Sequence, residues 1–155
     1  MTVRQERTGW RDQRISERHR KWGSACAAVD VDFLLVEHNF GKPAALVEYK
    51  SHWAEIPNLK HANYRALMEV ADSAKIPFIV VFYWPKRWAF QVFPVNRTAK
   101  RYFNWGERLS EIEFVKRLYN LRNRVLNGSI EANLNSIYPP VNTNIDWEDK
   151  DNPFE

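Results

Sequence analysis

The fold is decided by residues 31–50, whose sequence is VDFLLVEHNFGKPAALVEYK. Two segments rich in branched and aromatic residues, 31–37 and 44–50, flank a turn at 38–43. Within this turn Gly41 tolerates the positive φ that tight turns often require. The pattern predicts two antiparallel strands joined as a β-hairpin.

The centre of this turn sets the register of the hairpin. A turn centred on residue 40 places Asp32 opposite Glu48 and Asp30 opposite Lys50. Directly opposed residues of an antiparallel pair project to the same face, a few ångströms apart. We therefore expect three carboxylates and one lysine on a single, otherwise apolar sheet face.

Such a group of charges needs compensation, because like charges facing across strands and buried carboxylates destabilise a sheet. Mg²⁺ provides it, since this ion binds oxygen ligands, takes one or two carboxylates and keeps waters and phosphate oxygens around it. A lysine beside the ion can position or deprotonate an attacking water. The alternative is an internal ion-pair network in which Asp30 and Glu48 hold Lys50.

The motif of a hydrophobic residue and Asp, a hairpin, and Glu-x-Lys closing the second strand resembles the PD-(D/E)XK, or restriction-endonuclease-like, nuclease superfamily. The matching residues are Val31-Asp32 and Glu48-Tyr49-Lys50, with fifteen residues between Asp32 and Glu48. One departure is Val31, which stands where the motif has Pro. The resemblance covers roughly residues 10–95. It implies an α/β fold with a three-layer core, in which a mixed β-sheet containing the hairpin is flanked by helices.

The resemblance also implies an activity, that of a Mg²⁺-dependent DNA endonuclease with Mn²⁺ as a substitute ion. Asp32, Glu48 and the main-chain carbonyl of Tyr49 would hold the metal. Lys50 would orient the attacking water, and the metal would stabilise charge on the phosphate and the leaving oxygen. The products would carry a 5′-phosphate and a 3′-hydroxyl.

Whether two further acids, Glu17 and Asp30, belong to the metal site is open. Many members of the superfamily add an acidic residue from the first helix, and Glu17, fifteen positions before Asp32, matches that placement. Because Glu17 lies among arginines, a surface ion pair explains it equally well. Asp30 also follows a hydrophobic residue, but we prefer Asp32 because it is the acid opposite Glu48.

The rest of the chain predicts one domain over residues 1–128. Residues 77–84 are almost continuously apolar, which suits a strand buried on both faces. The amphipathic spacing over 58–75 predicts a helix from which Asn63 and Tyr64 could face the site. The other expected elements are a helix at 10–22, a strand at 88–95, and a helix at 109–124 with Ser110 as N-cap.

The charge distribution favours a nucleic-acid partner. Residues 129–155 hold six acids and one base, net −5, which leaves +9 on residues 1–128 within the overall net charge of +4. A basic body favours a polyanion, and we expect DNA. One helix face carries a stripe of cations that would contact phosphates or simply be solvated: Arg11, Arg14, Arg18 and Lys21.

Composition excludes other classes of protein. No apolar run approaches the roughly 20 residues that span a bilayer, so no membrane association is expected. The charged N-terminus lacks a signal-peptide core, and the single Cys26 cannot form an internal disulfide, so we expect a cytoplasmic location. The acidic tail at 129–155 should be extended, either folding back over basic surface or packing structurally.

Three hypotheses remain open at this stage. The first is the endonuclease, which would act as a symmetric homodimer if one small site cuts both strands. The second is a non-catalytic nucleic-acid-binding module with the same fold. The third is a partner protein whose acidic tail covers its own basic surface.

Several aromatic residues could stack on unpaired bases or simply fill the core, namely Trp53, Tyr64, Trp84 and Trp88.

Overall fold

The structure, a computed structural model, describes residues 13–125, and the chain divides into two units after Asp30. The N-terminal unit contains helix α1 (Gln13–Arg20) and the 3₁₀ turn η1 (Ser24–Cys26). Gly23, with φ of 99°, lies between them. The helix predicted at 10–22 is therefore confirmed over 13–20. Its first turn, Arg11 and the acidic tail lie outside the described residues.

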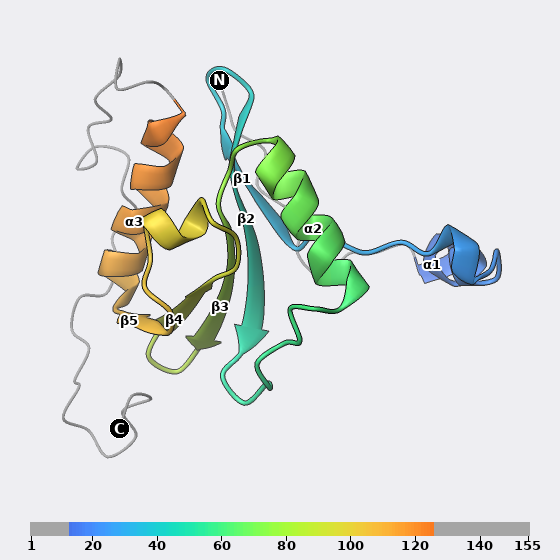
Figure 1. Ribbon diagram of the computed structural model, residues 1–155. Helices are drawn as coiled ribbons and strands as arrows, with labels where there is room; N and C mark the ends of the chain where they lie inside the picture. The colour runs from blue at the N-terminus through green and yellow to red at the C-terminus, as the bar shows by residue number, and fades with distance from the viewer. Residues whose placement is uncertain (1–12, 126–155) are drawn as a thin grey trace. The chain divides into compact units, whose positions relative to one another are not determined.

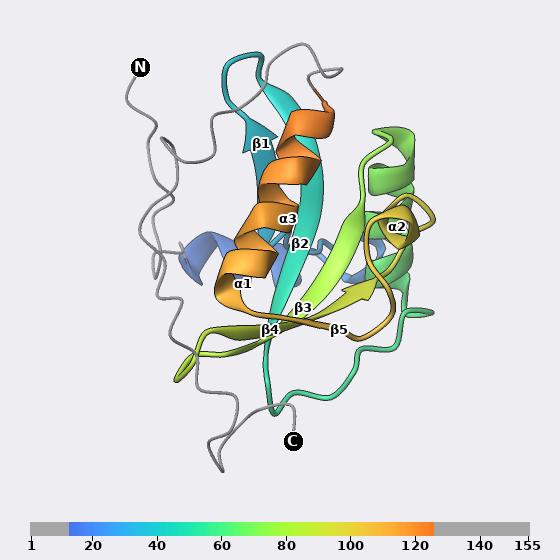
Figure 2. The same cartoon turned by 90° about the vertical axis from the view of Figure 1, so that its left-hand side faces the viewer.

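The second unit, called the sheet unit below, is built on five strands in the order β1-β2-β3-β4-β5 (Figures 1 and 2). Strands β2 and β3 are parallel, and the other neighbours are antiparallel, so the sheet is mixed. Helix α2 connects the two parallel strands. The element bounds are β1 Phe33–Glu37, β2 Lys42–Ser51, α2 Ala62–Ser73, β3 Phe78–Trp84, β4 Ala89–Pro94, η2 Ala99–Arg101, β5 Glu107–Leu109 and α3 Glu111–Arg124.

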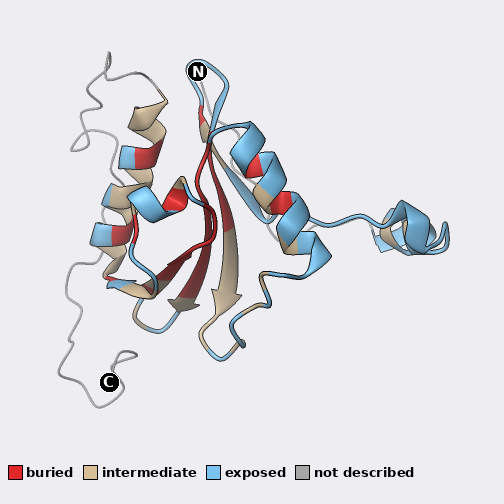
Figure 3. Ribbon diagram, in the orientation of Figure 1, coloured by how far each residue is buried: buried red, intermediate tan, exposed pale blue. Residues whose placement is uncertain are grey.

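Two hydrophobic cores lie on opposite faces of this sheet. Leu67 and Ala71 of α2 pack on one face, with Leu46, Val80 and their neighbours of the same parity. The opposite face packs on α3 through a second set that includes Ala45, Val47, Ile79, Val81, Phe114 and Leu121. The sheet unit is thus a three-layer α/β structure, in which β2, β3 and β4 hold most of the buried strand residues and lie between α2 and α3 (Figures 1 and 3). Strand β3 is buried on both faces over most of its length, as its apolar sequence predicts.

The hairpin has the predicted register beside the candidate site. Phe33 pairs with Val47 and Leu35 pairs with Ala45, and both pairs follow from a turn centred on residue 40. A bulge after Leu35 then shifts the pairing so that Val36 lies opposite Pro43. A bulge is where a strand accommodates a proline, because proline has no amide hydrogen to donate.

The turn of the hairpin is stabilised by a residue that the sequence analysis did not assign. Glu37 is only 2% exposed, and its carboxylate accepts hydrogen bonds from the backbone N–H groups of Asn39 (3.0 Å) and Phe40 (2.8 Å). Gly41 has a φ of 62° and completes the turn. A buried carboxylate is tolerated here because two amides satisfy it.

Three other elements refine the predictions. Ser110 caps α3 as predicted, and its capping box is completed by Glu113. Helix α2 begins at Ala62 rather than near 58, with His61 as N-cap. Two elements were not predicted, η2 and β5, because each is only three residues long and carries no periodic pattern. Among the described helices, none has the length and apolar character needed to cross a membrane.

Candidate active site

Two of the predicted site residues, Glu48 and Lys50, lie toward the carboxyl end of β2, on the face covered by α2. Side chains alternate between the faces of a strand. Leu46 belongs to the core under α2, so Glu48 and Lys50 project to that same face. Because β2 and β3 are parallel, their carboxyl ends share one edge of the sheet, the usual place for ligands in open α/β sheets.

A single oxygen atom of Glu48 joins the central residues of the site. Its Oε1 atom lies 2.9 Å from the Lys50 amine. The same oxygen accepts a hydrogen bond of 2.7 Å from the hydroxyl of Tyr64, in the first turn of α2. Glu48 Oε2 takes part in neither contact. The Glu48 side chain is 18% exposed and that of Lys50 is 33% exposed, so a ligand can reach both.

Asp32 comes directly before β1 and is exposed. Phe33 and Val47 form the first pair of the hairpin, and the same register continued by one residue would set Asp32 opposite Glu48. Burial raises the pKa of Tyr64, and the hydrogen bond to Glu48 and then the charges of Glu48 and Asp32 raise it further. Tyr64 is therefore a neutral hydrogen-bond donor at ordinary pH. Both carboxylates are near enough to act on its hydroxyl.

The side chain of Tyr49 lies on the opposite face, against α3. Its ring makes edge-to-face contacts with Phe33 at 5.1 Å and with Phe114 at 6.3 Å between centroids. Burial raises the pKa of Tyr49 to about 12. Only the main-chain carbonyl of Tyr49 is left to serve as the predicted ligand, because its phenol stays protonated within the core.

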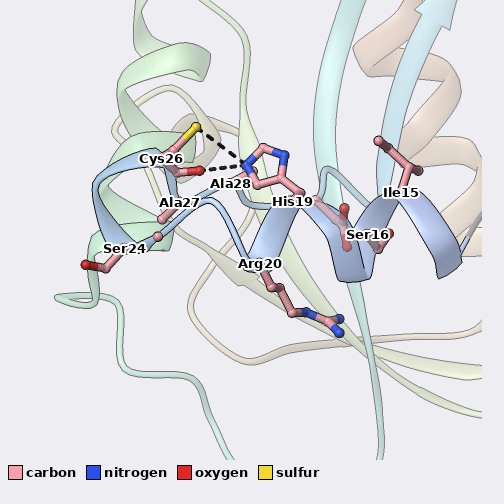
Figure 4. Close-up of a pocket in the computed structure, with 10 residues that line it drawn as sticks. Ile15, Ser16, His19, Arg20, Ser24, Cys26, Ala27 and Ala28 are labelled. Carbon is pink, nitrogen blue, oxygen red and sulfur yellow. Dashed lines mark hydrogen bonds between the residues drawn. The ribbon is translucent and has the colours of Figure 1, made fainter.

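The remaining predicted residues belong to the N-terminal unit. Glu17, Arg14 and Arg18 are exposed on α1, and Lys21 and Asp30 are exposed after it. Figure 4 shows a pocket of this unit, where the Nε2 atom of His19 contacts the carbonyl oxygen of Cys26 at 2.6 Å and its sulfur at 3.9 Å. The participation of Glu17 and Asp30 in the site stays a prediction.

The predicted donors are all oxygen atoms. Within residues 13–125, no cluster of three or more His, Cys, Asp or Glu side chains is arranged to hold a metal ion. The predicted set consists of two carboxylates, Asp32 and Glu48, and the carbonyl of Tyr49. Mg²⁺ commonly binds through one or two carboxylates and retains several waters, so these residues fit that ion.

Comparisons of the chain with protein-family models, with curated proteins and with solved structures found no match.

Proposed function

We propose that this protein is a Mg²⁺-dependent DNA endonuclease of the PD-(D/E)XK kind. The observation that carries the proposal is the position of Glu48. Its carboxylate lies between the Lys50 amine and the Tyr64 hydroxyl, toward the carboxyl end of β2.

The alternative of a purely structural ion pair explains this arrangement less well. Partly exposed ion pairs stabilise proteins by only about 0–1 kcal/mol. Glu48 and Lys50 are both partly exposed, and the core beneath them is already continuous through Leu46, Val80 and Leu67. Fold stability therefore gives little reason to group an acid, a lysine and a tyrosine at the edge where ligands usually bind.

Each residue has a distinct role in the proposed reaction. Asp32, Glu48 and the Tyr49 carbonyl would hold the ion, with Mn²⁺ as a substitute for Mg²⁺. When bound, the ion supplies Lewis-acid stabilisation of charge on the phosphate and on the leaving oxygen. The Lys50 amine orients a water for in-line attack on phosphorus, and the Tyr64 hydroxyl fixes the orientation of the Glu48 carboxylate.

The proposed substrate follows from charge. Residues 1–128 carry the excess of positive charge, and Arg14, Arg18 and Lys21 are exposed. Cations spread over a surface bind phosphates without reading sequence. A site that cuts both strands of a duplex would in addition require a homodimer.

The direct test is incubation of the purified protein with supercoiled, linear, branched and single-stranded DNA, in Mg²⁺, Mn²⁺ or EDTA. We expect cleavage of at least one substrate with either metal and none in EDTA. DNA binding without cleavage of any substrate in Mg²⁺ or Mn²⁺ would instead identify a non-catalytic binding module.

Replacing Tyr64 with Phe tests the positioning role of its hydroxyl. We expect cleavage at low Mg²⁺ to fall about 10- to 100-fold, the range found for residues that orient metal ligands. The half-saturating Mg²⁺ concentration should rise, because the Glu48 carboxylate loses its 2.7 Å hydrogen bond. Cleavage rates across a Mg²⁺ titration, together with melting curves, provide the measurement.

A matched control for this variant is Tyr102→Phe, which removes a hydroxyl far along the sequence from the site. An unchanged Mg²⁺ dependence in Tyr64→Phe would show that the hydroxyl does not position Glu48.

A further inference from the structure

Two exposed tryptophans lie at the end of the sheet that carries the candidate site, Trp53 on the side of α2 and Trp88 on the side of α3. Trp53 follows Lys50 by three residues, and 77% of its surface is exposed. Ser51 pairs with Tyr83, so the turn between β3 and β4 lies at the same edge as the end of β2. That turn presents Trp88, which is 48% exposed.

Trp53 is supported by rings beneath it. The imidazole of His52 contacts the Trp53 ring edge-to-face at 4.4 Å, and it stacks on Trp84 at 5.6 Å with an interplanar angle of 27°. The backbone N–H of His52 donates to the carbonyl of Tyr83 at 3.1 Å. These two ring contacts make His52 a packing surface beneath Trp53. Its Nδ1 atom is buried and has no hydrogen-bond partner in the described part of the chain.

Positive charge accompanies these rings. The β3–β4 turn contains Lys86 and Arg87 directly before Trp88, and the amine of Lys50 lies on the neighbouring strand. Exposed aromatic rings beside cations form the kind of surface that binds single-stranded nucleic acid, since bases stack on the rings while phosphates meet the cations.

We propose that Trp53, supported by His52 and Trp84, stacks on an unpaired base of the DNA strand whose phosphate lies at Glu48 and Lys50. This inference rests on the proposed function and names its substrate class. Three residues of chain span at most about 10 Å, and a stacked strand rises about 3.4 Å per nucleotide. The stacked base therefore lies within about three nucleotides of the phosphate that is cut.

An unpaired base is required because bases within a duplex are covered on both faces by their neighbours. An indole on the protein surface reaches a base face only in a single strand, at a branch point or in an unstacked nucleotide. The preferred substrate is therefore DNA with unpaired nucleotides beside the cleavage position.

The test measures DNA binding in EDTA, where no cleavage is expected, by fluorescence anisotropy of a labelled single strand. Trp53→Ala should weaken binding about 5- to 100-fold, the usual effect of losing one base–aromatic stack, while Trp53→Phe retains most of the affinity. The control is Trp105→Ala, which removes another exposed tryptophan (55% exposed), packed on Phe93 near the other end of β4. Its affinity should match that of the wild type.

A second DNA strand, of equal length but carrying abasic positions, identifies the base as the partner. Wild type and Trp53→Ala should bind this strand equally, because it offers no base to stack. An unchanged affinity of Trp53→Ala for the normal strand, or an equal loss on the abasic strand, overturns the stacking proposal even if the wild type cuts DNA in Mg²⁺. A loss of affinity on the normal strand but not on the abasic strand supports the stacking proposal. It does so even if no substrate is cut, since the absence of cleavage would contradict only the proposed nuclease activity.

Discussion

Replacing Glu48 with Gln is expected to lower the rate of DNA cleavage by more than about 100-fold, because residues that merely orient metal ligands already account for 10- to 100-fold. The amide removes the charge that would hold the ion and that now faces the Lys50 amine at 2.9 Å. Asp32→Asn and Lys50→Ala should have similar effects. DNA affinity in EDTA should stay close to wild type, since it comes from many phosphate contacts. Initial cleavage rates in Mg²⁺ and anisotropy titrations measure the two quantities.

The matched control is Glu69→Gln, which neutralises an exposed acid on α2 and should cleave like the wild type. Wild-type cleavage by Glu48→Gln would remove the basis of the catalytic assignment. Glu17→Gln belongs in the same series, since full activity in that variant would make Glu17 an ordinary surface residue.

Replacing Asn96 with Ala is expected to destabilise the fold by roughly 3–5 kcal/mol, because each buried polar group left without a partner is unfavourable by about 1–3 kcal/mol. Asn96 is 3% exposed, and its Oδ1 atom accepts from the backbone N–H groups of Phe78 (2.9 Å) and Ala99 (3.0 Å). Its Nδ2 donates to the carbonyl of Ile76 (2.9 Å) and to the carboxylate of Asp72 (3.0 Å). The amide therefore ties the end of α2 to the start of β3.

The melting temperature should fall by about 10 °C or more, on the usual relation of a few degrees per kcal/mol. Thermal unfolding followed by circular dichroism measures the change. Asn104→Ala, at an exposed asparagine, serves as control and should stay within about 0.5 kcal/mol of wild type. A loss below 1 kcal/mol in Asn96→Ala would mean that water replaces the amide.

The sequence was sufficient for the hairpin and for the face that Glu48 and Lys50 share, but β1 begins only at Phe33, so Asp30 and Asp32 lie outside the strand on which they were expected. The hairpin and the shared face follow from local rules, namely the period of two along a strand and the position of a short turn. The register of Phe33 with Val47 was predicted from the turn alone and is confirmed. The buried strand β3 and the Ser110 cap were equally readable, because each depends on neighbouring residues in the chain.

The tertiary structure decided which residues support those charges. Only the packing of α2 on the sheet brings the Tyr64 hydroxyl to Glu48, sixteen residues away in sequence. The sequence placed Tyr64 on a helix that could face the site, but nothing local distinguished a hydrogen-bond donor from a core ring. Strand β5 could not be predicted from the sequence either, because it is defined by a non-local pairing of three residues with β4.

The hairpin turn and the connection from α2 to β3 show which features depend on local sequence and which depend on tertiary packing. The sequence alone determined where the chain reverses and that an acid and a lysine share a strand face, because backbone geometry repeats over two to four residues. The roles of Glu37 as a buried acceptor for the turn and of Asn96 as a buried link between α2 and β3 came only from the structure. Those roles depend on burial and on partners brought together by packing, which residue order alone does not encode locally.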